Sequence, residues 1–471
     1  MSRAEKKLRY PESSVFYRNL NRVYPKISHG EGVWLFDDAG KRYLDACSGA
    51  FVANIGHGVP EIAKAVSEQL EKVAYVNGTA FTTESAEELA AQLAKLSLRG
   101  LDKFYFLSSG SEAVEAALKL SRHYWVEKNR PQKHKIISQS PGYHGNTLLA
   151  MSASARGHYK KIYQPWLLDC AMVPAPYAYR CDCGGNLSCR VCSGTILEEI
   201  ILKEGADTVA AFIMEPVGGS STGASVPRAD YLRNVREICD RHDVLLIADE
   251  VLTGAGRTGK WLATEHYGVL PDIMTLGKGI SGGYLPLSAV VAGEKILDPI
   301  AKGYGSFLHA QTFSHAPSIC SAGLAAIRYI QKHGLIERAA KMGDLLQKKL
   351  EALKELPFVG DVRGIGMLAG VEFVSDVKTK EPFPRRLKFA ETFTSIAQDL
   401  GLIVWPNVGQ ADGENAADRP GRSTAGLGRG DLVMIAPPFT IAEFEIDLIV
   451  SFFKEALEKT ASKITVTGEI K

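Results

Sequence analysis

Lys278 stands between two glycines, directly after the apolar run Asp272–Leu276, and is the first candidate for chemistry in this chain. The run is typical of a buried strand, and ligands of open α/β sheets bind beyond the carboxyl ends of the strands. Glycines on both sides let a flat ligand approach the backbone. A lysine placed there can form a Schiff base with a carbonyl ligand, although a lone lysine after a strand is more often a surface charge.

Asp249 supports the interpretation of Lys278 as a Schiff-base lysine. It ends a second apolar run, Val244–Ala248, so we expect it at the same edge of the sheet as Lys278. A carboxylate there can face the protonated pyridine nitrogen of pyridoxal 5′-phosphate (PLP) and keep that ring an electron sink. The alternatives for this residue are a helix N-cap or a Mg²⁺ ligand.

Two further segments follow predicted strands. Ser109 and Glu112 have the spacing of a capping box, so a helix begins at this point and its free N–H groups suit a phosphate; a plain helix cap is the alternative. Tyr143, in the turn Pro141–Gly145, offers a flat face for ring stacking, or is only a partly exposed aromatic. For His144 we expect packing or hydrogen bonding rather than catalysis.

The elements that position these residues follow from the pattern of apolar residues. Short apolar runs at 103–107, 135–137, 209–214, 244–248, 272–276 and 288–292 alternate with helical segments such as 112–125 and 230–240. This alternation predicts a mostly parallel α/β sheet with helices on both faces. From about residue 330, long helical segments (334–356, 387–400, 441–459) surround short strands (367–374, 432–436), which indicates a smaller α+β domain. Residues 32–44 read as a β-hairpin, and 61–73 as a helix.

Composition limits the function classes. The chain has 471 residues, of which 45% are hydrophobic and 23% charged, and its net charge is +2. This balance is globular and gives no electrostatic reason to expect nucleic acid or a membrane surface. Eight cysteines do not make a disulfide scaffold. No apolar run approaches the ~18 residues of a membrane span, and no apolar segment follows the charged N-terminus, so we expect a cytoplasmic protein without a secretory signal.

Residues 254–259 match two nucleotide-binding patterns imperfectly. The G-x-G-x-x-G pattern of dehydrogenases should open a helix directly, but residues 249–253 intervene, and no acid ends a strand about 20 residues later. The phosphate loop of nucleotide hydrolases needs Ser or Thr where Trp261 stands. We therefore interpret this segment as a glycine-rich turn.

Together these segments supply a phosphate cup, a ring platform, an acid for the ring nitrogen and a Schiff-base lysine. The chain resembles the class III (ω-type) aminotransferases, PLP enzymes of fold type I, over about residues 25–455. The resemblance rests on Ile247–Gly259, Asp272–Ile280 and Glu215–Gly219. It implies a large PLP-binding domain at 60–330 with a mostly parallel seven-stranded sheet covered by helices. It also implies a small α+β domain at 331–471, and an N-terminal segment, 1–59, that packs with the small domain.

The resemblance also implies roles for individual residues. Lys278 would hold the cofactor and then move the proton, and Asp249 would pair the pyridinium nitrogen. The other residues implied in cofactor binding are Gly110 and Ser111 at the phosphate, Val251 and Tyr143 on opposite faces of the ring, Glu215 in support, and Thr312, which reaches the phosphate from a neighbouring subunit. Ala50 and Phe51, with Phe81 beside them, resemble substrate-pocket positions.

The implied reaction is ping-pong transfer of an amino group from a primary amine, ω-amino acid or β-amino acid to a keto acid, with pyruvate as the expected acceptor. The implied assembly is a homodimer with shared active sites, or a tetramer, that binds only small-molecule partners. A racemase, aminomutase or decarboxylase would carry the same motifs. A PLP-binding regulatory protein is a further alternative, but we see no appended DNA-binding module. The identity of the amine stays open.

The acceptor site departs from the family pattern. Amine-type members often carry a mobile arginine before the final Pro-Pro segment, but here Trp405 stands in that place. Arg429, which follows the glycine-rich stretch 410–430, is our candidate for binding the carboxylate of the keto acid, because a guanidinium makes bidentate bonds to carboxylates. Arg422 and Arg419 are alternatives, and all three can instead be solvated loop residues.

A cysteine-rich segment is the second departure. Its four cysteines, at C-x-C and C-x₂-C spacing, are Cys181, Cys183, Cys189 and Cys192. They can hold a structural zinc ion, or they are reduced loop cysteines or a local disulfide. We expect no metal in the catalytic site itself.

Overall fold

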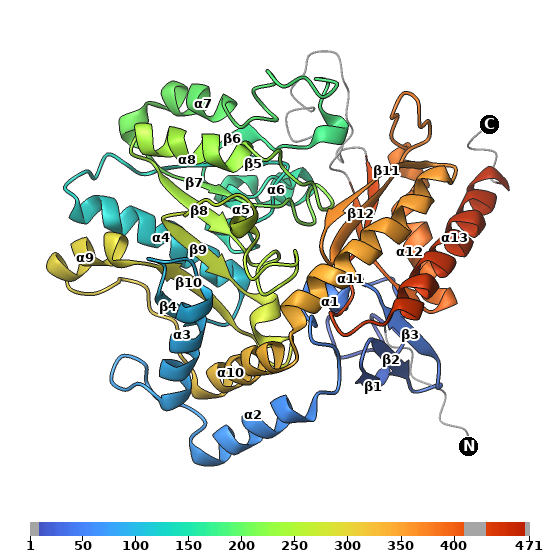
Figure 1. Cartoon of the computed structure of the whole chain (residues 1–471), viewed down its shortest axis with the longest axis horizontal. Coiled ribbons are helices and arrows are strands. Elements are labelled where there is room, and N and C mark those ends of the chain that lie inside the picture. The colour runs from blue at the N-terminus through green and yellow to red at the C-terminus, as the bar shows by residue number, and fades with distance from the viewer. Residues whose placement is uncertain (1–8, 409–429, 467–471) are drawn as a thin grey trace.

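The computed structural model describes residues 9–408 and 430–466. Its larger part is built on a seven-stranded sheet in the order β4–β10–β9–β8–β7–β5–β6 (Figure 1). The strands are β4 (Lys103–Leu107), β5 (Lys135–Ser140), β6 (Ala171–Pro174), β7 (Val209–Met214), β8 (Leu245–Asp249), β9 (Ile273–Leu276) and β10 (Ser288–Ala292). β10 runs opposite to the other six strands, which share one direction. The predicted mostly parallel sheet is therefore confirmed, and β6 is the strand that the apolar pattern did not predict.

Helices cover both faces of this sheet, because its strands alternate their side chains between two apolar layers. In β7, Ala211 and Ile213 pack in one layer with α4 (Gly110–Glu127), while Phe212 and Met214 pack in the other with α8 (Tyr231–Arg241). The first layer also takes α5 (Leu148–Ala153) and α9 (Glu294–Lys302), and the second takes α7 (Ile196–Glu204). Near β9 and β10, α10 (Pro317–Lys332) packs against α2 (Pro60–Lys72) and α3 (Glu84–Leu96). The helix α6 (Gly157–Tyr163) follows α5.

The C-terminal part has its own sheet, β11–β12–β15–β14, which is antiparallel throughout. Its strands are β11 (Val359–Ile365), β12 (Leu368–Phe373), β14 (Trp405–Val408) and β15 (Asp431–Ile435), and its helices are α11 (Leu335–Leu350), α12 (Phe389–Leu400) and α13 (Glu443–Val466). The sequence predicted β12, β15 and the three helices, but not β11 or β14.

The N-terminal segment is joined to the C-terminal part by a third sheet, β1–β2–β3–β13. The predicted hairpin is confirmed as β2 (Trp34–Asp37) and β3 (Arg42–Asp45), with β1 (Ile27–Glu31) beside β2. β13 (Leu402–Ile403) pairs in parallel with β3. The short helix α1 (Ser48–Phe51) follows β3 along the chain. Domain boundaries at 59/60 and 330/331 stay a prediction.

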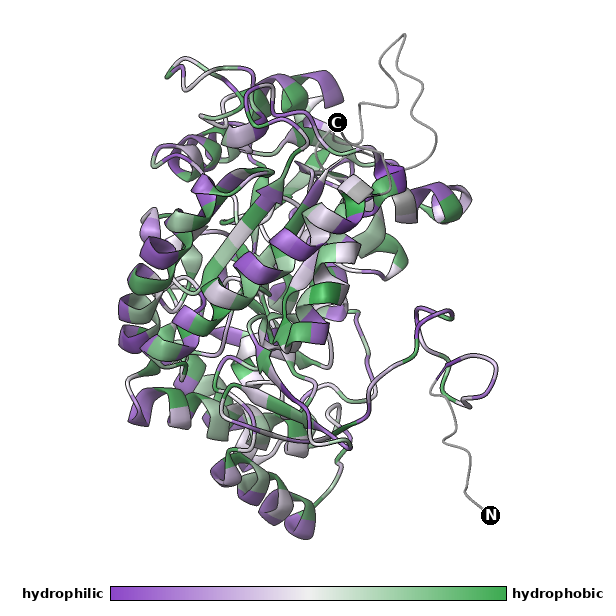
Figure 2. Cartoon of the chain, turned by 90° about the vertical axis from the view of Figure 1, so that its right-hand side faces the viewer, coloured by the Kyte–Doolittle hydropathy of each residue, from purple (hydrophilic) through white to green (hydrophobic). Residues whose placement is uncertain are grey.

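One apolar cluster continues from the large sheet into the C-terminal part: it includes Leu89 and Met274 together with Phe373 and Phe453. Figure 2 shows hydrophobic residues along the strands and inner sides of the helices, and hydrophilic residues on the outer sides. Among the described residues, no helix is long and apolar enough to cross a membrane.

Candidate active site

The candidate residues meet at one edge of the large sheet. Five neighbouring segments leave the carboxyl ends of β4, β5, β7, β8 and β9 at this edge, because these strands share one direction. We call the residues they bring together the strand-end site: Gly110, Ser111, Tyr143, His144, Glu215, Asp249, Val251 and Lys278. The edge is where ligands of open α/β sheets bind.

Asp249 is held by three neighbours. One of its oxygens, Oδ1, accepts bonds from the Val251 N–H at 3.1 Å and from the Thr275 hydroxyl on β9 at 2.9 Å. The other, Oδ2, lies 2.8 Å from Nδ1 of His144. Since a carboxylate only accepts hydrogen bonds, Nδ1 carries the proton. The side chain of Asp249 is buried and has a fixed orientation.

Lys278 follows β9 in a left-handed backbone conformation, with φ of 46°. Such a conformation costs about 1–3 kcal/mol in a non-glycine residue and is concentrated at functional sites. Burial lowers the pKa of the Lys278 amine from its ordinary value of 10.5, although the carboxylates of Asp249 and Glu215 act in the opposite direction. A larger share of this amine is therefore neutral and nucleophilic at a given pH than in an exposed lysine.

The start of α4 forms a cup with no room for larger side chains. The predicted cap is present: the Ser109 hydroxyl accepts from the Glu112 N–H at 3.3 Å, and the Glu112 carboxylate accepts from the Ser108 N–H at 3.0 Å. A Cβ on Gly110 would lie 2.7 Å from Cγ1 of Val251. The backbone thus approaches Val251 as closely as only glycine allows, and the free N–H groups of the helix face the site.

Ser111 joins this cup to the loop after β5. Its hydroxyl donates to Oδ1 of Asn146 at 3.0 Å and accepts from the Asn146 N–H at 3.0 Å. The Ser111 hydroxyl proton is therefore already used, and it is the backbone N–H groups here, at the positive end of the α4 dipole, that suit an anionic group such as a phosphate.

Tyr143 and Glu215 are connected directly. The Tyr143 N–H donates to Oε2 of Glu215 at 3.2 Å, and the Gly219 N–H donates to Oε1 at 3.0 Å. Burial raises the pKa of the Glu215 carboxyl, and the nearby Asp249 carboxylate raises it further. The guanidinium of Arg156, itself buried, lies 4.3 Å from the centroid of the Tyr143 ring and fixes the ring plane by a cation–π contact.

Of the three predicted pocket residues, Phe51 is the one that reaches the strand-end site. Its buried ring lies 6.0 Å from Nζ of Lys278 and 5.5 Å from the ring of Trp405. Ala50 precedes it and is partly buried, whereas Phe81 is 68% exposed. The aromatic pair of Phe51 and Trp405 forms an apolar wall beside the lysine.

The remaining predicted residues lie elsewhere. Thr312 is exposed in the turn before α10, and its neighbour Gln311 donates to Ser108 and Glu112 at 3.3 and 3.2 Å. Arg429, with Arg422 and Arg419, lies outside the described residues. The four cysteines lie on the loop between β6 and α7, and none of them belongs to the strand-end site.

The sequence did not indicate the contacts that three buried residues make in or near the strand-end site. His144 was expected to pack or hydrogen-bond, but its bond to Asp249 was not predicted, because 105 residues separate the two. Arg156 follows α5 and gave no motif. Arg257 donates to the carbonyls of Met367 and Pro437, at 3.1 and 2.7 Å, and so fastens the turn after Asp249 to the C-terminal part. The glycine-rich spacing around Arg257 was the only available signal.

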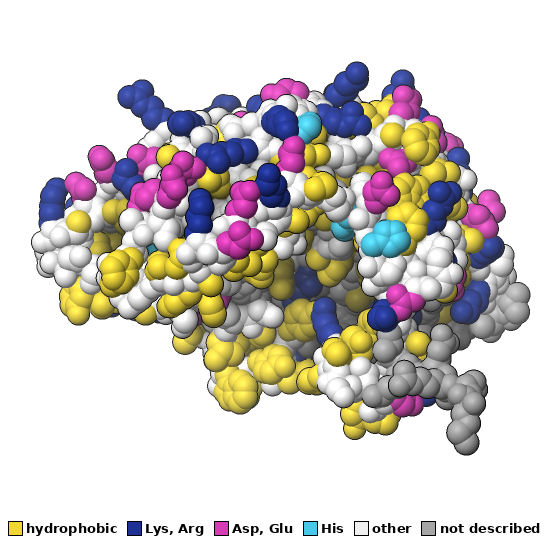
Figure 3. Space-filling view, turned by 90° about the horizontal axis from the view of Figure 1, so that it is seen from below, with side chains coloured by type: hydrophobic (Ala, Val, Ile, Leu, Met, Phe, Trp, Pro, Cys, Tyr) yellow, Lys and Arg dark blue, Asp and Glu magenta, His cyan; other side chains and the backbone are white. Residues whose placement is uncertain are grey.

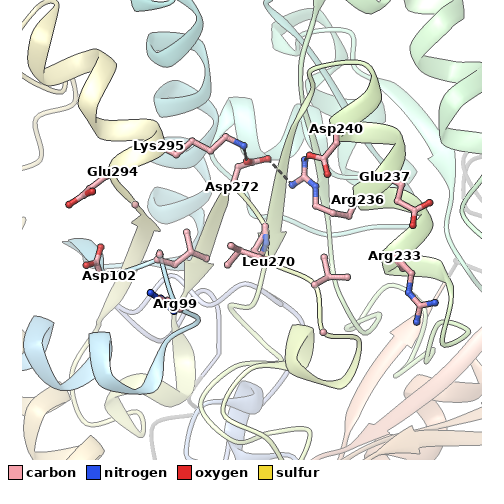
Figure 4. Close-up of a pocket in the computed structure, with 16 residues that line it drawn as sticks. Arg99, Asp102, Arg233, Arg236, Glu237, Asp240, Leu270, Asp272, Glu294 and Lys295 are labelled. Atoms are coloured by element: carbon pink, nitrogen blue, oxygen red, sulfur yellow. Dashed lines mark hydrogen bonds and ion pairs between the residues drawn. The ribbon is translucent and has the colours of Figure 1, made fainter.

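A separate crevice of about 700 Å³ lies at the opposite edge of the sheet (Figure 4). Its charged groups neutralise one another: Asp272, at the start of β9, is 2.8 Å from Arg236 and 2.5 Å from Lys295. Lys278 follows the other end of the same strand. The crevice is therefore distinct from the strand-end site.

Comparison with known proteins gives the family. A lysine and a carboxylate at the strand ends of a mixed, mostly parallel sheet define a PLP enzyme of fold type I, and the structural neighbours are transaminases of this fold. Residues 16–457 match the family model of class III aminotransferases, and the chain belongs to this family.

The relatives match over nearly their whole length. YodT of Bacillus subtilis, an uncharacterised aminotransferase, is 40% identical over 94% of this chain and 98% of its own. The putrescine–pyruvate aminotransferase of Pseudomonas aeruginosa is 33% identical over 95% and 94%. The ω-transaminase of Pseudomonas jessenii in complex with pyridoxamine phosphate (PMP) superposes with a TM-score of 0.85, at 30% identity, over 95% and 94%.

Class III aminotransferases depend on PLP, and the strand-end site fits this group. A Cβ on Gly110 would lie 2.7 Å from Cγ1 of Val251, so only glycine lets the start of α4 lie this close to Val251. The carboxylate of Asp249 suits a protonated ring nitrogen, and the N–H groups of α4 suit a phosphate. The amine of Lys278 suits the aldehyde.

Proposed function

We propose that this chain is a PLP-dependent ω-aminotransferase that moves an amino group from a primary amine, ω-amino acid or β-amino acid to a keto acid, pyruvate in the first place. The observation that carries the proposal is the meeting of Lys278 with Asp249 at one sheet edge, beside the start of α4 at Gly110. Relatives named as a putrescine–pyruvate aminotransferase and an ω-transaminase support it.

Bound PLP supplies an electron sink for the bond that breaks at the substrate carbon. In this proposal, Lys278 would hold the cofactor, and its amine, when free, would take up and return the proton of the substrate carbon. Asp249 keeps the ring nitrogen protonated. His144 and Thr275 fix the orientation of the Asp249 carboxylate. Gly110 and Ser111 bind the phosphate. Transfer of the amino group to a second substrate at the same site gives a ping-pong sequence.

The remaining residues contact the cofactor ring or hold in place the residues that contact it. In this proposal Val251 packs on one face of the cofactor ring and Tyr143 on the other, while Glu215 holds the Tyr143 loop through the Tyr143 N–H.

The amine side chain lies, in this proposal, against the wall of Phe51 and Trp405, with Ala50 and Phe81 as further pocket positions. This wall is apolar and suits donors with an uncharged chain or ring next to the amine. The carboxylate of the keto acid is bound by Arg429, for which Arg422 and Arg419 are the alternatives. We place the reaction in the cytoplasm.

The proposal includes a homodimer in which Thr312 reaches the phosphate in the neighbouring subunit. Thr312 is exposed, and exposed apolar side chains surround its turn: Phe313, 55% exposed, lies 6.0 Å from Tyr75, and Phe81 is 68% exposed. Seen from below, the molecule has apolar side chains gathered beside a hollow (Figure 3). Exposed apolar groups of this kind favour association.

The test is a product assay on the purified protein supplied with PLP. Amine donors are incubated with either pyruvate or 2-oxoglutarate, and alanine or glutamate is measured against consumed donor. The proposal predicts alanine in equimolar amount with the deaminated donor. A racemase, aminomutase or decarboxylase, the alternative reactions for this fold, would convert its substrate without a keto acid, and that result would replace the proposed function.

A further inference from the structure

Four cysteine side chains converge on the loop between β6 and α7, at the top of Figure 1. We call them the four-cysteine cluster: Cys181, Cys183, Cys189 and Cys192. Their sulfur atoms all lie within 4.8 Å of one another. Sγ of Cys181 is 3.6 Å from that of Cys189, and Sγ of Cys183 is 3.6 Å from that of Cys192.

We propose that the four-cysteine cluster binds a single Zn²⁺ as a closed structural site. Four thiolates at about 2.3 Å from a tetrahedral zinc ion stand about 3.8 Å apart, close to the distances observed. A disulfide would bring two sulfurs to about 2.05 Å. The sulfur pairs Cys181–Cys189 and Cys183–Cys192, both at 3.6 Å, do not approach this distance. Four protein ligands leave no open position for a substrate, so the ion has a structural and not a catalytic role.

The backbone of the loop turns so that Cys181 and Cys183 face Cys189 and Cys192. Gly184 and Gly185 have φ of 56° and 85°, in the left-handed region where glycine is free of strain, and they reverse the chain directly after Cys183. A second turn follows, in which the Cys189 N–H donates to the Asn186 carbonyl at 3.1 Å. The Cys192 N–H points at Sγ of Cys189, at 3.5 Å, as a donor to a thiolate ligand would.

Binding would replace four S–H bonds by four Zn–S bonds and release the thiol protons to solvent, so the complete site carries two negative charges. A positive group borders the loop at this point: Nη1 of Arg228 donates to the Leu187 carbonyl, between the two cysteine pairs, at 2.9 Å. The charge of Arg228 is shared between this loop and Asp230, whose carboxylate accepts from Nε of Arg228 at 2.9 Å and from Nη2 at 2.5 Å.

The loop that zinc would hold lies between the seven-stranded sheet and the β11–β12–β15–β14 sheet. Just before the cluster, Arg180 Nε donates to Oε1 of Glu372 on β12 at 2.6 Å, and the Tyr177 hydroxyl bonds to the same buried carboxylate. Arg363 of β11 reaches the Tyr177 hydroxyl at 2.9 Å. Just after the cluster, the Ser193 carbonyl accepts from Asn234 of α8 at 2.9 Å. A metal ion at this point would fix the bridge between the large sheet and the C-terminal part.

The test is the metal content of the full-length protein, purified without chelator and measured by inductively coupled plasma mass spectrometry. We expect about one zinc ion per chain. The double variant Cys181→Ser/Cys183→Ser should fall to background, while Cys170→Ser, which removes a cysteine outside the cluster, should keep its zinc. The visible band of bound PLP should be unchanged in both, because none of these cysteines belongs to the strand-end site.

A second measurement needs no variant. Replacement of zinc by Co²⁺ in the wild-type protein should give the intense d–d bands and sulfur-to-cobalt charge-transfer bands of tetrahedral thiolate ligation. The proposal is overturned by zinc that stays bound in the double variant, or by iron in place of zinc. It is also overturned if no metal binds after anaerobic reduction and addition of zinc, or if peptide mapping finds the four cysteines in disulfides. None of these outcomes depends on transaminase activity.

Discussion

Nδ1 of His144 lies 2.8 Å from Oδ2 of Asp249, so that an imidazole from the loop after β5 orients a carboxylate at the end of β8. Both side chains are buried. Hydrogen bonds to charged groups contribute about 1.5–3 kcal/mol, which corresponds to about a 10- to 100-fold change in an equilibrium constant.

The first prediction concerns this bond. His144→Ala should weaken PLP binding by about tenfold or more, because Asp249 loses a donor and its fixed orientation. His144→Gln, which keeps a donor, should recover part of the affinity. The affinity is measured by titrating the apoprotein with PLP and following protein fluorescence. His242→Ala is the matched control, since His242 pairs with Glu198 at 2.9 Å away from the site. Equal PLP affinity in His144→Ala and wild type would contradict this role.

The second prediction concerns the cup at the start of α4. Gly110→Ala places a Cβ 2.7 Å from Cγ1 of Val251, so Val251 must move into the space proposed for the ring. Overpacking of this kind costs about 1–3 kcal/mol, and we expect PLP affinity to fall about tenfold. Val251→Ala in the same chain should restore part of it, with Val251→Ala alone as the control. If the double variant binds no better than Gly110→Ala, the steric explanation is wrong.

Much of this site could be predicted from the sequence, because strand ends are local features. The apolar runs before Asp249 and Lys278 fixed both residues at one edge, given parallel strands. The cap at Ser109 follows from spacing within a single helix turn. Such patterns depend on neighbours in the chain and not on tertiary packing.

Contacts between distant segments could not be predicted. The contact of Trp405 with Phe51 depends on β14, whose short sequence carries Pro406 and gave no strand pattern. The two-residue strand β13 exists only because β3 offers it a partner. Arg156 shows its role only in the fold, because nothing in its flanking sequence indicates the Tyr143 ring. The sulfur geometry of the four-cysteine cluster likewise required the folded loop.

A third prediction follows from the lowered pKa of Lys278. In the PLP-free protein, this amine should react with an amine-directed acylating reagent with a half-maximal rate at a pH below 10.5, since burial disfavours its charged form. As pH falls through this lowered pKa, the amine gains its proton and labelling should stop. Labelling of the Lys278 peptide is followed by mass spectrometry across a pH series. A midpoint at or above 10.5 would show that the neighbouring carboxylates outweigh burial.

The fourth prediction tests whether two chains share each site. Lys278→Ala lacks the essential amine, and Thr312→Ala should bind PLP more weakly because the phosphate of the neighbouring site loses a donor. Chains of the two variants, mixed and reassociated, should regain activity at limiting PLP, because one site of each mixed dimer then has both Lys278 and Thr312. Each variant treated alone is the control. Absence of recovery, with mixed dimers present, would place Thr312 outside the partner's site.

The measurement that tests the central claim most directly is the absorption spectrum of the PLP-loaded protein during the two half-reactions. We predict that an amine donor alone removes the visible band of the cofactor bound to Lys278, and that pyruvate, added after excess amine is removed, restores it. Lys278→Ala should bind PLP without completing this cycle. A wild-type band that no amine changes, or a cycle that proceeds equally well in Lys278→Ala, would contradict the account.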